Sequence, residues 1–210
     1  MEASLRRYTT LSSALHVLQN RCLTLLSPDK WDDRNDAYFL SQYRRRSDAG
    51  SVLALCFAEA PETYHHWRVF AHGPEGVCIQ FRRDALEEYL QDCKGLVFKK
   101  VIYKKLNTPG RKPFAVSELP FVKRWPYRDE KEYRIIHVSD DEIEAHPIEI
   151  GLETIERITL SPWIPKPLSE TIKASMKATR DCSRLNVYRS TLVDTEAWKR
   201  RANPNLSKVF

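Results

Sequence analysis

Short apolar stretches recur along the chain and predict a series of β-strands. Residues 51–58 (SVLALCFA) form a continuous apolar run, which is typical of a central strand buried on both faces. Residues 76–81 (GVCIQF) place Val77, Ile79 and Phe81 on one side, which is the period of a half-buried strand. Similar runs predict strands at 22–26, 96–103, 132–138, 146–151, 155–160 and 185–193.

Apolar positions at helical spacing predict helices between these strands. Residues 11–20 carry their leucines on one face, with Thr9 or Thr10 as the N-cap. Asp84 and Glu87 are spaced as a capping box ahead of an amphipathic helix. We also expect a helix at about 168–180, a loop or short helix at 31–37, and a long loop or lid at 107–120.

The order of these elements lacks the regular βαβ alternation of a doubly wound sheet. It predicts a compact α+β fold with mixed, mainly antiparallel sheets and short helices. A chain of 210 residues, with 42% hydrophobic and 30% charged residues, is expected to form a single domain over 1–210. No apolar run approaches a membrane span and residues 1–10 lack a signal-peptide core, so we expect a soluble, cytoplasmic protein without membrane contact.

The five cysteines are scattered and form no C-x-x-C pair, which predicts buried free thiols rather than a zinc site or disulfides. Net charge is +6, and the basic C-terminal region from about 166 carries the excess, with ten bases against four acids. This region could contact nucleic acid or a phosphate-bearing ligand, or could simply be a solvated face. With six glycines and no glycine-rich phosphate motif, the chain excludes P-loop and Rossmann enzymes.

Three groups of residues could carry chemistry. In an extended segment Glu130, Glu132 and Arg134 would share one face, where paired carboxylates push their pKa values apart and a guanidinium lowers one of them. The alternative is a solvated salt-bridge ladder. Arg7 and Tyr8, with Arg6 and Thr9 beside them, precede a helix start and would suit an anionic ligand; the alternative is a frayed terminus.

The third group, Trp67 with Phe70, could stack on a planar ring or belong to the core. The acidic loop 31–36 fits a metal site or a capped turn, and His65 and His66 lack partners at metal-ligand spacing. We therefore predict no metal ligand.

The order of these blocks resembles the bacterial family catalogued as domain of unknown function 2971. The blocks are Arg7-Tyr8, the loop from Ser27-Pro28 to Asp36, Cys56-Phe57, the stretch from Trp67 to Phe81, and Lys123…Trp125 followed by Glu-x-Glu-x-Arg at 130–134. The resemblance covers roughly residues 5–180. It departs from the family in the loop 31–36 and in the four residues between Trp125 and Glu130.

The block order is also similar to that of ADP-ribosyltransferases of the DNA-targeting toxin type, in which a catalytic glutamate opens a late strand. Glu132-Tyr133-Arg134-Ile135-Ile136 has that form, and Glu130-x-Glu132 resembles the signature of arginine-directed members. The resemblance implies NAD as substrate, Glu132 and Glu130 as catalytic residues, and a toxin or phage-defence context. Arg7, Tyr8, Trp67 and Arg134 would bind the cofactor, with Arg7 on the pyrophosphate and Tyr8 or Trp67 beside the nicotinamide. The basic C-terminal region would hold a nucleic-acid acceptor.

Two other classes of function remain open at this point. Pro28-Asp29 and Asp129-x-Lys131 supply the letters of a metal-dependent nuclease, although about 100 residues separate them. A nucleic-acid or protein-binding module without activity would use the Glu-x-Glu-x-Arg residues only as salt bridges.

Overall fold

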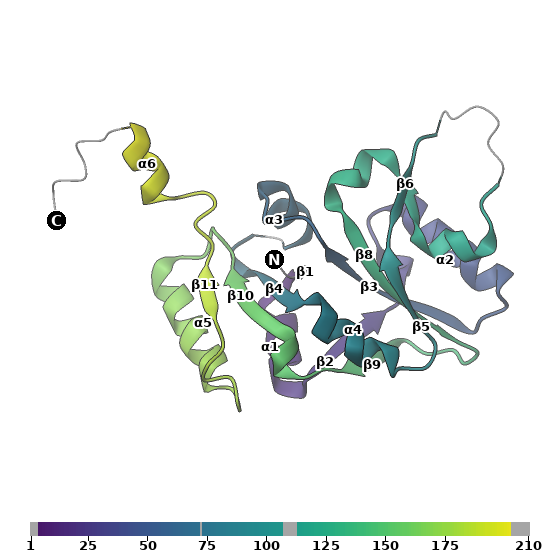
Figure 1. Ribbon diagram of the computed structural model, residues 1–210, viewed down its shortest axis with the longest axis horizontal. Helices are drawn as coiled ribbons and strands as arrows, with labels where there is room; N and C mark the ends of the chain where they lie inside the picture. The colour runs from purple at the N-terminus through teal and green to yellow at the C-terminus, as the bar shows by residue number, and fades with distance from the viewer. Residues whose placement is uncertain (1–3, 72, 107–112, 203–210) are drawn as a thin grey trace.

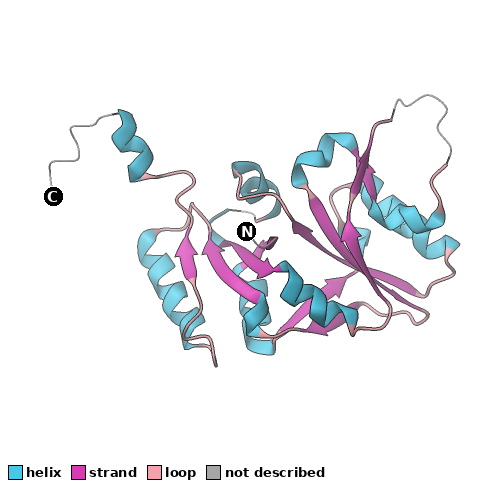
Figure 2. Ribbon diagram, viewed as in Figure 1, coloured by secondary structure: helices cyan, strands magenta, loops and turns pink. Residues whose placement is uncertain are grey.

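The computed structural model describes residues 4–71, 73–106 and 113–202, and the fold is mixed α+β with a mostly antiparallel sheet and short helices, as predicted (Figures 1 and 2). The strands are β1 Ser4–Thr10, β2 Cys22–Leu26, β3 Ser51–Ala58, β4 Gly76–Arg82, β5 Leu96–Lys100, β6 Ile102–Lys104, β7 Val122–Arg124, β8 Glu132–Ser139, β9 Ala145–Glu149, β10 Ile155–Leu160 and β11 Val187–Arg189.

The helices lie between these strands. They are α1 Leu11–Asn20, α2 Arg34–Arg46, α3 Tyr64–Phe70, α4 Arg83–Gln91, α5 Lys166–Ala178 and α6 Glu196–Ala202, with 3₁₀ segments η1 Pro28–Lys30, η2 Gly73–Glu75, η3 Val116–Phe121, η4 Trp125–Glu130 and η5 Leu152–Thr154. Of the predicted lid at 107–120, residues 107–112 lie outside the described residues. No helix in the part of the chain that the structure describes is long and apolar enough to cross a membrane.

The main sheet has the order β11-β10-β4-β1-β3-β2-β9, and β8 and β5 continue it beyond β3. β1 pairs with β4 along its whole length but meets β3 only at Arg6↔Ala58, and β2 meets β3 only at Leu26↔Ala54. β8 covers the other edge of β3 from Ser51 to Ala58. The strands β1 and β2 therefore diverge from β3 and leave part of its edge without a strand partner.

The core packs on both sides of this divergence. One large apolar cluster joins β1, β4, β8 and β10 to α1, α4 and α5; among its fully buried members are Leu5, Leu18, Phe81, Leu86 and Ile135. A smaller cluster packs α2 and η3 against β3 through Leu40, Phe121 and Val52. The five cysteines are free and at least partly buried, as expected.

Several predicted elements differ from the structure. The capping box is wrong, because α4 begins at Arg83 without a side-chain cap and Glu87 instead accepts a hydrogen bond from Arg83 Nε at 2.7 Å. The predicted strand at 96–103 divides into β5 and β6, since Val101 breaks the run and donates its N–H to Glu132 O at 2.9 Å.

Three further expectations need correction. The predicted loop or short helix at 31–37 is mainly the start of the longer helix α2. Of the predicted strand at 185–193, only Val187–Arg189 is extended. The segment with Arg6, Arg7 and Tyr8 is neither frayed nor loop-like, because it forms the central strand β1 with Leu5 and Tyr8 buried.

Candidate active site

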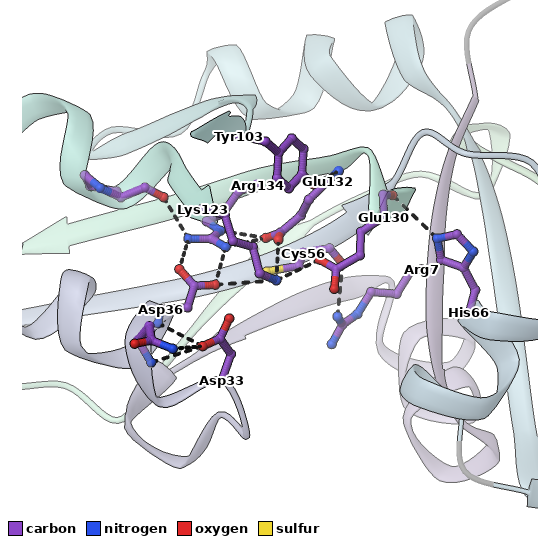
Figure 3. Close-up of polar contacts among 12 residues, drawn as sticks. Arg7, Asp33, Asp36, Cys56, His66, Tyr103, Lys123, Glu130, Glu132 and Arg134 are labelled. Carbon is purple, nitrogen blue, oxygen red and sulfur yellow. Dashed lines mark hydrogen bonds and ion pairs between the residues drawn. The ribbon is translucent and has the colours of Figure 1, made fainter. Parts of the chain in front are cut away.

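Five charged side chains from α2, β7, η4 and β8 form a buried cluster beside β3 (Figure 3). Lys123 Nζ lies 2.7 Å from Glu130 Oε2, 3.2 Å from Glu132 Oε2 and 3.7 Å from Asp36 Oδ2. Arg134 donates to Glu132 Oε1 at 2.7 Å and to both Asp36 oxygens at 2.9 and 2.6 Å. Three carboxylates thus meet two cations, which leaves one excess negative charge when every group is ionised.

The local backbone explains how Glu130 and Glu132 come to share Lys123. Glu132 and Arg134 lie two residues apart in β8 and point to one side, as the sequence predicts. Glu130 is not in the strand: it ends the 3₁₀ segment η4, and Lys131 follows with φ 45°, in the left-handed region. This turn, rather than an extended i, i+2 relation, brings the Glu130 carboxylate back to Lys123.

The surroundings separate the two glutamates electrostatically. Burial opposes ionisation of Glu132, but the charges of Arg134 and Lys123 outweigh burial and lower its pKa to about 2. For Glu130 burial is the larger effect and raises the pKa, and the neighbouring Lys123 offsets only part of it. Glu132 is therefore a permanently ionised carboxylate at neutral pH, while Glu130 is the more readily protonated partner.

A pocket of about 580 Å³ opens where β1 and β2 diverge from β3. That volume is within the range of roughly 300–1,000 Å³ that holds small-molecule ligands. Glu130, Glu132, Asp36 and Lys123 line it, and so do the side chains of β1 and the loop before α2. Apolar groups at its wall include Trp31, Leu26, Val69, Phe70 and Tyr127.

Arg6 and Arg7 bring positive charge to the same pocket. Arg7 Nη1 donates to Cys56 O at 3.0 Å, and so occupies an edge of β3 that no strand covers. Arg6 Nη1 donates to Ala60 O at 3.0 Å. Neither guanidinium forms an ion pair within the part of the chain that the structure describes, and burial lowers the pKa of Arg7. An anionic ligand would supply the missing negative charge.

Tyr8 lines the pocket beside Arg7, and its ring stacks on His66 with centroids 5.3 Å apart. Its hydroxyl is buried beside the Cys78 thiol, whereas Oδ2 of Asp33, which also borders the pocket, is buried without a hydrogen-bond partner. Burial raises the pKa of Tyr8, so its hydroxyl remains protonated.

Trp67 and Arg134, both predicted to bind the cofactor, are fully buried and do not line the pocket. The Trp67 indole meets the Tyr8 ring edge-on at 5.2 Å and donates Nε1–H to Glu62 Oε1 at 2.6 Å. Arg134 also donates to Pro120 O at 2.8 Å. Trp67 therefore packs against Tyr8, and Arg134 hydrogen-bonds Glu132. Neither Trp67 nor Arg134 lines the pocket itself.

Residues of the alternative hypotheses lie elsewhere. Asp29, Asp129 and Lys131 are exposed and do not line the pocket, so the letters of the nuclease motif are not assembled there. Within the described residues, no group of three or more His, Cys, Asp or Glu side chains is placed to hold a metal ion. In the acidic loop, Asp33 caps α2 by accepting from the N–H groups of Asn35 and Asp36, which is the capped-turn alternative.

Sequence reasoning missed Lys123, Asp36 and Asp33 as site residues. Lys123 stood in the block that resembles a known family, but its place seven residues before Glu130, beside Arg124, gave no sign of contact with that glutamate. Asp36 lies 98 residues from Arg134 in sequence, and only the fold pairs them. The run of acidic residues at 31–36 was the one available signal for Asp33 and Asp36.

No model of a known protein family matches the chain, and no curated protein matches its sequence. Similar solved structures include DarT from Thermus sp. 2.9 in complex with ADP-ribosylated ssDNA, with a TM-score of 0.46 and 13% identity over 90% of this chain and 94% of that chain. The complexes of the same protein with carba-NAD+ and NAD+ give TM-scores of 0.46 and 0.43, each at 13% identity over 90% of this chain and 96% of that chain. At these TM-scores the similarity assigns neither activity nor ligand to this chain.

Proposed function

We propose that this protein is an ADP-ribosyltransferase-like enzyme that uses NAD as its donor substrate. The observation that carries the proposal is the charge distribution of the pocket. Two arginines without carboxylate partners lie in the same pocket as a cluster of three carboxylates and two cations. NAD has matching parts, an anionic pyrophosphate and a cationic nicotinamide ribose.

Glu132 would stabilise the transition state. When the bond between nicotinamide and ribose C1′ breaks, its electron pair leaves with nicotinamide and the ribose becomes an oxocarbenium-like cation. A preorganised carboxylate that is already ionised stabilises that cation without reorganisation. Glu132 satisfies this requirement because Arg134 and Lys123 fix its position and lower its pKa.

Glu130 would act on the acceptor. A nucleophile that attacks C1′ must lose a proton, and Glu130 borders the pocket with its pKa raised above the usual carboxylate value, toward the range of an effective general base. The new bond forms between the acceptor and C1′, and the proton passes to the Glu130 carboxylate and then to solvent. The products are ADP-ribosylated acceptor, nicotinamide and one proton.

Of the other predicted residues, two would contact NAD in this proposal and two would only position pocket residues. Arg7 would pair with the pyrophosphate through its remaining guanidinium N–H groups, and Tyr8, which lines the same pocket, would lie beside the nicotinamide. Trp67 would hold Tyr8 in place by packing against its ring, and Arg134 would hold Glu132 in place by its hydrogen bond, without contact with NAD.

The acceptor is proposed to be nucleic acid, held by the basic C-terminal region in a toxin or defence context. In support, α6 carries Lys199, Arg200 and Arg201 beside Trp198, which is 71% exposed. Figure 1 shows α6 at one end of the molecule and α2, which contributes Asp36, at the other. An acceptor bound at both places would therefore extend along the molecule, as a polymer can.

The test is incubation of the protein with labelled NAD, in the presence of DNA, RNA or cell lysate. Wild type should release nicotinamide and transfer label, and Glu132→Gln should lower the rate by at least about a hundredfold, the usual effect of losing one electrostatic stabiliser. Asp129→Asn is the matched control, since Asp129 is exposed, close in sequence and outside the pocket. It should retain the wild-type rate.

Thermal melting tests NAD binding independently of catalysis, because a ligand that binds only the native state raises the stability of that state. NAD should raise the melting temperature of wild type without added metal. If neither nicotinamide release nor a thermal shift occurs, the proposal is wrong. Chelator-sensitive cleavage of DNA would then favour the nuclease, and salt-sensitive binding alone would favour the binding module.

A further inference from the structure

Lys123 occupies the centre of the carboxylate cluster. Within the described part of the chain it is the one cation that forms an ion pair with both Glu130 and Glu132, whereas Arg134 pairs with Glu132 but not with Glu130. Its side chain is 9% exposed, and its ammonium lies 4.9 Å from the centroid of the Tyr127 ring. A buried lysine in such a place must have partners, and its partners here include both glutamates assigned to catalysis.

The small sheet of β6 and β7 fixes Lys123 relative to Glu132. Lys123 on β7 is paired in register with Tyr103 on β6. The Tyr103 hydroxyl accepts the backbone N–H of Glu132 at 2.8 Å, while Lys123 contacts the side chain of the same glutamate. The position of the ammonium group is therefore tied to both the backbone and the carboxylate of Glu132.

Two carboxylates that share a site repel one another, and one of them takes up a proton unless a cation intervenes. Lys123 Nζ is that cation, at 2.7 Å from Glu130 and 3.2 Å from Glu132. Asp36 adds a third negative charge at 3.7 Å from the same atom. Without the ammonium, only Arg134 would remain for three carboxylates, and it does not contact Glu130.

We propose that Lys123 is a positioning residue for the reaction assigned above: its ammonium group holds the Glu130 and Glu132 carboxylates at one wall of the pocket and keeps Glu130 in the ionised form that can accept a proton. The proton-accepting role of Glu130 rests on the proposed function. The control of its ionisation rests on the geometry of the cluster alone.

Among the described groups around Glu130, Lys123 is the one that favours the ionised form of the Glu130 carboxylate by direct contact. The titratable and charged neighbours of Glu130 are Lys123 from β7, Glu132 from β8, Asp36 from α2, Tyr103 from β6, His66 from α3, and Arg7 from β1 in the same pocket. His66 faces the Glu130 carbonyl, not its carboxylate, with Nε2 3.5 Å from the oxygen. Burial, Glu132 and Asp36 all raise the pKa of Glu130, and Lys123 opposes them.

The first experiment titrates Glu130 itself, in the free protein, from the ¹³C shift of its side-chain carboxyl. Glu130→Gln identifies the resonance by its loss. Replacement of Lys123 by Gln keeps a hydrogen-bond donor but removes the charge, and should raise the pKa of Glu130 by about 1 to 3 pH units. Lys123→Arg should leave it within about half a unit of wild type, since the opposite charge remains in contact.

Lys131→Gln is the matched control. Lys131 lies between the two glutamates in sequence, is exposed and does not line the pocket. The same loss of charge at this position should leave the Glu130 titration unchanged. An equal shift in the Lys123→Gln and Lys131→Gln variants would overturn the proposal, because it would reflect net charge rather than contact.

The second experiment measures nicotinamide release against pH. The rate should fall as pH decreases through the pKa of Glu130, since the base must be ionised. Lys123→Gln should move this acid limb of kcat to higher pH by the shift seen in the titration. Its KM for NAD should stay within about threefold of wild type. Lys123→Arg should return the acid limb to the wild-type pH. A uniform loss of kcat with an unmoved limb, or a change in KM alone, would overturn the positioning role.

The two experiments separate this inference from the proposed function. If wild type releases no nicotinamide, the proposed function fails, yet the titration still decides whether Lys123 controls Glu130. If Lys123→Gln does not fold, the double variant Lys123→Gln/Glu130→Gln removes one of the repelling charges. It should recover a cooperative melting transition that Lys123→Gln alone does not show, and failure to do so would contradict the repulsion on which the proposal depends.

Discussion

Arg7 carries a positive charge that no carboxylate in the described part of the chain neutralises. Its Nη1 bonds a backbone carbonyl of β3, and the residue borders the pocket. Arg7 is partly buried, and an anionic ligand in the pocket would supply the counter-ion that the described residues do not. Arg7 and Glu132 therefore differ in their ion pairing. Arg7 has no carboxylate partner among the described residues, whereas both carboxylate oxygens of Glu132 accept hydrogen bonds from cations.

Arg7→Gln should therefore weaken NAD binding by about ten- to a hundredfold, the effect of losing one hydrogen bond to a charged group. Isothermal titration of wild type and variant measures it. Arg184→Gln is the control with the same charge loss, because Arg184 is exposed and outside the pocket. Unchanged NAD affinity in Arg7→Gln would remove Arg7 from the binding site.

The residue types at the site were partly predictable from the sequence. Glu130, Glu132 and Arg134 stood out because charged residues preceded an apolar strand, and the structure brings all three together. Lys123 and Asp36 could not be found in this way, because their contacts cross elements far apart in the chain. Trp67 carried a strong aromatic signal, but its burial depends on the packing of α3 against β1.

Helix α2 connects the acidic loop to the buried cluster. Asp33 caps its first turn through Oδ1, which accepts the N–H groups of Asn35 and Asp36 at 3.0 and 3.4 Å. Asp36, one turn on, then faces Arg134. The same carboxyl group of Asp33 has its second oxygen at the pocket without a partner. Asp33 therefore caps helix α2 and also lines the pocket.

Two substitutions of Asp33 should separate these roles. Asp33→Ala loses the cap and should lower the free energy of unfolding by about 1 kcal/mol, whereas Asp33→Ser retains a capping oxygen and should lie within a few tenths of wild type. Both lose the pocket carboxylate and should affect ligand binding alike. Urea denaturation monitored by circular dichroism measures the first effect; equal stabilities of the two variants would contradict the cap.

At the element scale, periodicity located the long apolar elements well. The helix at Leu11–Asn20 and the strands at Cys22–Leu26 and Ser51–Ala58 have their predicted bounds, and Thr10 is the N-cap. β1 was missed because only Leu5 and Tyr8 of its residues are buried apolar groups, too few for a visible strand pattern. Its identity as a strand comes from pairing with β4, a long-range contact.

Charge is unevenly distributed over the whole molecule. The pocket combines cationic and anionic walls, whereas the basic C-terminal region includes α6, which has three cations in its last turn. α6 lies beyond β11 at one end of the molecule (Figure 1). Binding of a polyanion there would act through screened charges and would depend strongly on salt.

Arg200→Gln/Arg201→Gln should therefore weaken single-stranded DNA binding and reduce the slope of log affinity against log salt by about 1.4, from about 0.7 for each lost phosphate contact. Fluorescence anisotropy over a salt series measures the slope. Arg45→Gln/Arg46→Gln is the matched control, an exposed pair in the last turn of α2. If both double variants change the slope equally, the C-terminal region is not a distinct binding site.

The divergence of β1 and β2 from β3 has a consequence for how the protein folds during synthesis. β1 at Ser4–Thr10 needs β4 at Gly76–Arg82, and β3 at Ser51–Ala58 needs β8 at Glu132–Ser139. These two long-range pairings interleave along the chain, so each closes a large loop and neither half of the sheet is a contiguous segment. The residues that line the pocket run from Arg6, the third residue of β1, to Glu132, so a nascent chain can complete the pocket only after residue 132 has left the ribosome.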